Sequence, residues 1–230
     1  MIATDHLVFL HLHKSGGTFV NEGLLRFVQG ARTIGYHLPR KLIPPSLAHL
    51  PVVGLVRNPW SYYVSWFSFQ AARPQPNPLF RVLSDEGRLD FKATIRNMLE
   101  LGSGGDRLDP LLAALPKEYT HRGVNLPAFA LAPIRQSGMG FYSYLYRYMY
   151  DGAGVMYLGR MEQMRDELVS LFIAAGQPVS GPLRVYLQSA PASNTSEHAK
   201  YTEYYDDDLA KLVAARDASL IERFGYKFGD

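Results

Sequence analysis

The sequence predicts an α/β fold in which a central parallel sheet is flanked by helices. Three short apolar runs, residues 7–12, 51–56 and 155–159, are each followed by a loop and then by apolar residues at helical spacing. Strands that alternate with helices in this way are typical of a parallel sheet whose crossovers cover its faces. In such a sheet, ligands bind beyond the carboxyl ends of the strands, where the helices begin.

The first strand-loop-helix unit consists of the strand at 7–12, a glycine-containing loop and a helix. The helix is indicated by apolar residues at helical spacing, which are Val20, Leu24 and Phe27. A second, weaker strand is expected at 33–36, ending at His37. If this strand belongs to the same sheet, His37 lies at the same edge as the first loop.

The second unit begins with residues 51–56, which are continuously apolar, as a buried parallel strand should be. Pro59 follows and suits the first turn of a helix. The next 80 or so residues, about 71–150, break the strand-helix rhythm with many prolines, glycines and aromatic residues. We expect an insertion there that is mostly helix and loop.

The third unit pairs a strand at 155–159 with a helix at 162–175, for which Gly176 provides the stop. A last helix is expected to start at the acidic residues 206–208, which suit the positive end of a helix dipole. It would end before Gly225.

Length and composition predict one domain spanning residues 1–230, with a strand-helix core at about 5–70 and 151–230 and an insertion at about 71–150. The formal charge of +3 includes no dense basic run, so it permits an anionic ligand and does not indicate nucleic acid. Cysteine is absent, which excludes disulfides and thiolate catalysis. The amino-terminal apolar run is too short for a membrane span, so we expect a soluble, cytoplasmic protein; nothing indicates an oligomeric state.

The stretch FLHLHKSGGTF places a lysine, a serine, two glycines and a threonine where the first strand ends and the first helix begins. These residues are Lys14, Ser15, Gly16, Gly17 and Thr18. The glycines allow a tight turn with exposed amides, the hydroxyls are donors, and the helix start is partly positive. Together they suit a phosphate-like group, although a solvated lysine on an ordinary loop fits this stretch equally well. A Walker A motif is excluded, because its lysine follows the glycines.

A second polar feature follows the second strand. Arg57 comes directly after a buried strand, where an arginine is costly without an anionic partner. On the next helix, Ser61, Ser65 and Ser68 form a stripe of hydroxyls among aromatic residues. The stripe can face water, but a second phosphate would provide a partner for Arg57 and Ser65 together.

The two segments FLHLHKSGGTF and VVGLVRNPWSYYVSWFSF resemble the 5′-phosphosulfate and 3′-phosphate loops of the sulfotransferases that use 3′-phosphoadenosine 5′-phosphosulfate (PAPS). The resemblance extends to VMYLGRMEQMRDEL, with Arg160 and Glu162 in a structural role, and to the carboxyl-terminal segment. Within the family, the chain is most similar in these segments to the carbohydrate sulfotransferases and their soluble bacterial relatives. Residues 71–150 match no segment of the family, and many relatives have proline where His13 stands, which leaves His13 without an assigned role.

The resemblance implies a P-loop-NTPase-like sulfotransferase fold and in-line transfer of a sulfuryl group from PAPS to a hydroxyl or amine, with 3′,5′-bisphosphoadenosine (PAP) as product. Lys14 would stabilise the leaving phosphate, supported by the loop backbone at 15–18, while the family's arginine-serine pair assigns Arg57 and Ser65 to the 3′-phosphate. His37 is the candidate base, although a capped or core histidine fits this position equally well; His11 and His13 are alternatives. The resemblance assigns the cofactor to the core at about 5–70 and 151–230 and the acceptor side to the insertion at about 71–150. No metal is expected. The acceptor could be a glycan, a lipid, a phenol or a tyrosyl peptide.

Two other classes stay open. A nucleotide kinase-like phosphotransferase would share the sheet and the phosphate loop, but we find neither a lysine after the glycines nor an acidic residue at a strand end for magnesium. A non-catalytic PAP-binding protein would keep the anion-binding residues and lack a base or an acceptor site. The polar segment 193–201, with Lys200, is expected to be either a lid over the cofactor or a solvated loop.

Overall fold

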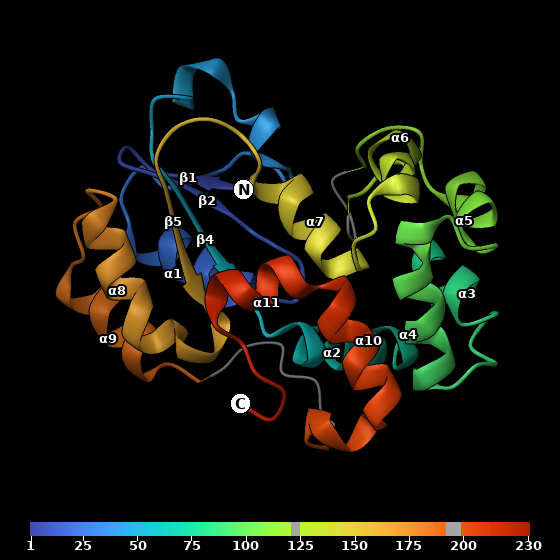
Figure 1. Cartoon of the computed structure of the whole chain (residues 1–230). Helices are drawn as coiled ribbons and strands as arrows, with labels where there is room; N and C mark the ends of the chain where they lie inside the picture. Colours follow the sequence, from blue (N-terminus) through green and yellow to red (C-terminus); the bar gives the residue numbers. More distant parts are fainter. Residues whose placement is uncertain (121–124, 192–198) are drawn as a thin grey trace. The chain divides into compact units, whose positions relative to one another are not determined.

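The computed structural model describes residues 1–120, 125–191 and 199–230 (Figure 1). Residues 193–198 of the expected lid therefore lie outside the described residues. The chain divides into two compact units. The first comprises Met1–Arg57, His121–Asn125 and Arg147–Thr195, and the second comprises Asn58–Thr120, Leu126–Tyr146 and Ser196–Asp230. Whether the chain behaves as a single domain stays a prediction.

The first unit contains a sheet of five strands among the described residues, in the order β3-β1-β2-β4-β5. The strands are β1 (Ile2–Ala3), β2 (Val8–Leu10), β3 (Arg32–Thr33), β4 (Val52–Val56) and β5 (Met156–Arg160). Strands β2, β4 and β5 are parallel, as the sequence predicts. The expectation of a parallel sheet is wrong for the remaining part, because β1 pairs antiparallel with both β2 and β3. The sheet is therefore mixed.

Strand β1 was not predicted, because two residues are too few to show an alternating pattern. Strand β3 is shorter than the expected strand at 33–36, and both of its residues are exposed. Since β1 runs opposite to both of its neighbours, β3 points in the same direction as β2. The segment after β3, which contains His37, thus leaves the sheet at the same edge as the loop after β2.

In the first unit, α1 (Gly17–Phe27) and α8 (Met164–Ala174) pack on this sheet, and α9 (Gly181–Ser189) packs against these two helices (Figure 1). Short 3-10 turns, η1 (Arg40–Leu42), η2 (Pro45–Leu47) and η5 (Met161–Gln163), lie between the larger elements. Buried apolar residues of the strands and the helices form one core, which includes Phe9, Phe19, Leu24, Val53, Leu55, Leu168, Phe172, Leu183 and Leu187. This core holds α1 against the sheet, so the start of α1 lies next to the loop that follows β2.

The described part of the second unit is helical. Its helices are α2 (Pro59–Ala71), α3 (Pro78–Leu83), α4 (Phe91–Glu100), α5 (Leu108–Ala114), α6 (Ala128–Leu131), α10 (Asp207–Arg216) and α11 (Ala218–Phe224), with the turns η3 (Leu101–Ser103), η4 (Ala132–Gln136) and η6 (Tyr201–Tyr204). Helix α7 (Phe141–Tyr150) begins in this unit, and its last residues belong to the first unit. The Asn58 side chain caps α2 by accepting from the amides of Trp60 and Ser61, and Pro59 occupies the first turn as expected.

The expected last helix is two helices, α10 and α11, which are separated at Asp217. The Asp217 side chain is fully buried and accepts hydrogen bonds from the Tyr63 hydroxyl (2.7 Å) and the Ser143 amide (2.8 Å). Burial raises the pKa of this carboxyl above its ordinary value. Asp217 therefore links α2 and the start of α7 to the α10–α11 junction within the second unit.

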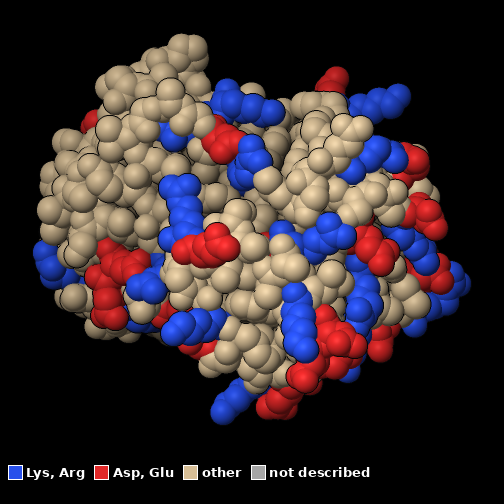
Figure 2. Space-filling view, in the orientation of Figure 1, with Lys and Arg blue, Asp and Glu red and all other residues tan. Residues whose placement is uncertain are grey.

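Within the described ranges, no helix has both the length and the apolar character that crossing a bilayer requires. On the face drawn in Figure 2, basic and acidic side chains lie interspersed and do not gather by sign.

Candidate functional site

The loop between β2 and α1 has the backbone of a tight turn. Lys14 and Gly16 adopt left-handed conformations, with φ of 58° and 77°. A side chain at Gly16 would also come within 3.1 Å of the Met164 sulfur and 3.2 Å of Met161 Cγ, so two methionines pack against the turn. Only glycine combines this conformation with so close a contact.

The partial positive charge at the start of α1 is not balanced by any acidic residue in its first turn. In the part of the chain that the structure describes, no side chain caps this helix, and its first turn contains no acidic residue. The first amide groups of an α-helix lack partners inside the helix, and the helix dipole places partial positive charge there. The start of α1 is thus electrostatically suited to an anion, as the glycine-containing loop predicts.

Gly17, the first residue of α1, touches His11. A Cβ atom on Gly17 would lie 2.0 Å from His11 Cδ2, far inside normal contact distance. His11 is 4% exposed. Its Nδ1 lies 3.2 Å from the side-chain amide nitrogen of Asn21, which is one turn after Gly17 on α1. The second glycine of the loop therefore allows an imidazole to pack against the beginning of the helix.

Three histidines come together at this edge of the sheet. The His37 ring centroid lies 4.2 Å from that of His11 and 5.0 Å from that of His13. Tyr36 packs edge-on against His37 with a centroid distance of 4.1 Å. The expectation that His37 lies near the loop after β2 is met by this geometry, and both alternative bases lie in the same cluster.

The hydrogen bond of His37 defines its tautomer. His37 Nδ1 lies 2.7 Å from the carbonyl oxygen of His11. Because a carbonyl oxygen only accepts, Nδ1 carries the hydrogen and the lone pair of the neutral ring is on Nε2. Burial lowers the pKa of His37 to about 4, so the neutral ring is the form present near pH 7. A neutral histidine with its lone pair on Nε2 can accept a proton there, as a general base must.

Arg40 and Asn125 hold the segment around His37. The guanidinium of Arg40 is buried and donates to the carbonyl oxygens of Gly152 (3.2 Å) and Ala153 (2.5 Å). Asn125 donates to the Tyr36 carbonyl at 2.8 Å. Neither residue is recognisable in the sequence, because no spacing or motif distinguishes a side chain whose partners are distant backbone carbonyls.

Lys14 and Arg57 meet beside the start of α1. Arg57 follows β4 and donates from Nη1 to the Lys14 carbonyl oxygen at 3.2 Å. The pKa of Lys14 is lowered to about 8, first by burial and then by the positive charge of Arg57. Two cations close enough to repel each other, beside a helix amino terminus, make this edge of the sheet electropositive.

Ser15 and Thr18 complete the predicted loop. Ser15 is buried, and its hydroxyl donates to the His13 carbonyl at 3.3 Å, so it supports the turn itself. Thr18 is half-buried in the first turn of α1. Ser65 belongs to the second unit, where it lies on α2 and is 2% exposed. The pairing of Arg57 with Ser65 at one phosphate stays a prediction.

Arg160, at the end of β5, has a carboxylate partner on α8. Its guanidinium Nε and Nη2 both lie 3.3 Å from Glu167 Oε1, and its backbone amide donates to Glu167 Oε2 at 2.7 Å. The acid named from the resemblance is Glu162, whereas this bridge is formed by Glu167, five residues further along the chain. The bridge ties β5 to α8, which fits the structural role expected for Arg160.

No family model matches the chain, and no curated protein matches it. The function is therefore argued from the residues of the site. Among the described residues, no group of three or more histidine, cysteine, aspartate or glutamate side chains has a geometry that could hold a metal ion.

Proposed function

We propose that this protein is a PAPS-dependent sulfotransferase that moves a sulfuryl group to a hydroxyl or amine acceptor. The observation that carries the proposal is the convergence of Lys14 and Arg57 beside the uncapped start of α1. Two cations and the amides at a helix start suit a ligand with more than one anionic group. The resemblance to the phosphosulfate loop suggests which ligand that is.

In the proposed reaction, an acceptor oxygen attacks the sulfur atom of PAPS. A new sulfur-oxygen bond forms while the bond from sulfur to the bridging oxygen of the 5′-phosphate breaks, and PAP departs. The Lys14 ammonium stabilises the charge that grows on that oxygen, together with the amides at the start of α1. His37 takes the acceptor's proton on Nε2, which the hydrogen bond at Nδ1 leaves available. Arg57 and Ser65 are assigned to the 3′-phosphate.

The first experiment measures thermal unfolding with PAP, ADP or ATP, without magnesium. A ligand at one hundred times its dissociation constant stabilises a fold by about 2.7 kcal/mol, which raises the midpoint of a chain of this size by roughly 5–10 °C. We expect PAP to give this shift and the other nucleotides to give much less. Lys14→Met and Arg57→Met should each weaken PAP binding roughly 10-fold or more, since each removes charge-assisted contacts. Arg184→Met, at an exposed position on α9, is the matched control.

The second experiment measures turnover of PAPS with glycan, lipid, phenol and peptide acceptors. We expect His37→Asn to abolish turnover and to keep the PAP-induced stabilisation. Stabilisation by PAP without turnover of any acceptor would favour the non-catalytic binding protein. Stabilisation by ATP and magnesium in preference to PAP would contradict the proposal and favour a phosphotransferase.

A further inference from the structure

His13, in the loop after β2, has a buried ring. The side chain is 7% exposed, and its Nδ1 makes no hydrogen bond to any described residue. Leaving a buried polar atom unpaired destabilises the fold, and native structures satisfy nearly all such atoms. An exception next to a candidate site calls for a partner that arrives with the ligand.

We propose that His13 is the residue that contacts the transferred sulfuryl group, through Nδ1. The inference rests on the proposed function and adds a contact that distinguishes PAPS from PAP. No role for a histidine at this position follows from the resemblance, since many relatives have proline there.

The neighbours of His13 decide which part of the ligand it meets. It directly precedes Lys14 in the chain, and its ring packs edge-on against His37 at a centroid distance of 5.0 Å. In the proposed reaction Lys14 serves the leaving oxygen and His37 serves the attacking oxygen. An in-line displacement places the sulfur atom between those two oxygens. A side chain adjacent to both residues is therefore suited to the sulfuryl oxygens, and less suited to the adenosine or the 3′-phosphate.

The electrostatic surroundings favour a neutral donor at this position. Burial lowers the pKa of His13 well below its ordinary value, and the neighbouring His37 and Lys14 lower it further. The ring is thus neutral near pH 7 and carries a single N–H. With that hydrogen on Nδ1, it donates to a sulfuryl oxygen while the positive charge of Lys14 stays directed at the leaving phosphate. The transferred group is then held by a hydrogen bond, and the charge that favours departure acts at the bridging oxygen.

The test compares the affinities for PAPS and PAP, which differ only in the sulfuryl group. His13→Leu removes the donor, and His13→Asn keeps an N–H donor close to the place of Nδ1. We expect His13→Leu to weaken PAPS binding roughly tenfold or more, with PAP binding unchanged within about twofold. His13→Asn should restore most of the PAPS affinity. If His13→Leu does not fold, His13→Phe serves instead, because it keeps a ring against His37 and lacks the nitrogen.

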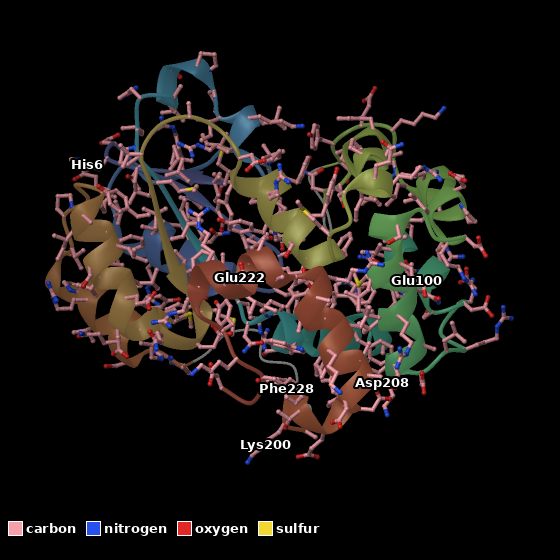
Figure 3. All side chains as sticks on the ribbon, in the orientation of Figure 1. His6, Glu100, Lys200, Asp208, Glu222 and Phe228 are labelled. Atoms are coloured by element: carbon pink, nitrogen blue, oxygen red, sulfur yellow. The ribbon has the colours of Figure 1, made fainter. Side chains whose placement is uncertain are left out.

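The matched control is His6→Leu. His6 is exposed and precedes β2, at the opposite edge of the sheet from His13, and it is labelled in Figure 3. It should leave both affinities unchanged. Equal losses for PAPS and PAP, or no loss for either, would overturn the role of His13 and leave the sulfotransferase proposal standing. If the wild-type protein binds neither nucleotide, the proposed function itself fails.

Discussion

Replacing Gly17 by alanine tests the contact between the loop and the histidine cluster. The added Cβ would lie 2.0 Å from His11 Cδ2 and 2.6 Å from Nε2. Normal carbon-carbon contact is about 3.5–4.0 Å, so the His11 ring or the helix must move by roughly 1.5 Å. The ring has little room to move, because it packs on His37 at 4.2 Å and its Nδ1 pairs with Asn21.

The expected cost follows from these distances. Overpacking a well-packed site costs about 1–3 kcal/mol. The reduced freedom of the unfolded chain returns about 0.4–1 kcal/mol of this when glycine becomes alanine. We therefore expect Gly17→Ala to lower the free energy of unfolding by about 1–2 kcal/mol and the melting temperature by roughly 2–8 °C. PAP binding should weaken as well, because the start of α1 shifts.

Thermal unfolding with and without PAP is the assay, and Gly181→Ala is the control. Gly181 is also the first residue of a helix, α9, and a Cβ there meets no atom within 4 Å. We expect this control to be neutral or slightly stabilising. In the double variant Gly17→Ala/His11→Ala the two costs should not add, since the second change removes the clashing ring. Equal stability of Gly17→Ala and Gly181→Ala, or full additivity with His11→Ala, would refute the reasoning.

Two further predictions concern charge. The pKa of about 8 for Lys14 means that its cation predominates below pH 8 and is lost above it, so PAP affinity should fall by up to about tenfold per pH unit above pH 8. Lys14→Arg, which stays charged, should remove this decline in titrations from pH 6 to 10, and a flat wild-type profile would contradict the assignment. Asp217→Ala leaves the buried Tyr63 hydroxyl and Ser143 amide without their acceptor, so it should lower the free energy of unfolding by about 2–5 kcal/mol in urea titrations. Asp217→Asn, which keeps an acceptor oxygen, should cost less; an alanine variant as stable as wild type would rule out this role.

The sequence predicted the elements whose pattern is long enough to read. Strands β2 and β4 are buried, continuous apolar runs, and the half-buried strand β5 begins with three apolar residues. Helices α1, α2 and α8 carry apolar residues at helical spacing with proline or glycine at their ends. Strands β1 and β3 have two residues each, so their pairing depends on the sheet and not on a local pattern. Helix α9 was missed, although Ser180 caps it and Pro182 stands in its first turn.

The site was predicted only as far as loop chemistry and strand direction allow. Lys14 and the glycines could be assigned because a turn before a helix has a known electrostatic character. The tautomer of His37 and the contact of His11 with Gly17 could not, because both depend on side chains that are close only in the folded chain. The break at Asp217 was hidden for the same reason, since Tyr63 lies 154 positions earlier in the sequence.

Because the side chains of Met161 and Met164 pack against Gly16, oxidation of a methionine at this turn changes the space that the turn has. The chain has seven methionines and no cysteine, so thioether sulfur is its only sulfur open to oxidants. Conversion of Met164 to the sulfoxide adds an oxygen to a sulfur atom that lies only 3.1 Å from the Cβ position of Gly16. Oxidation of a methionine would thus distort the anion-binding turn through a steric clash, without altering any charged residue of the site.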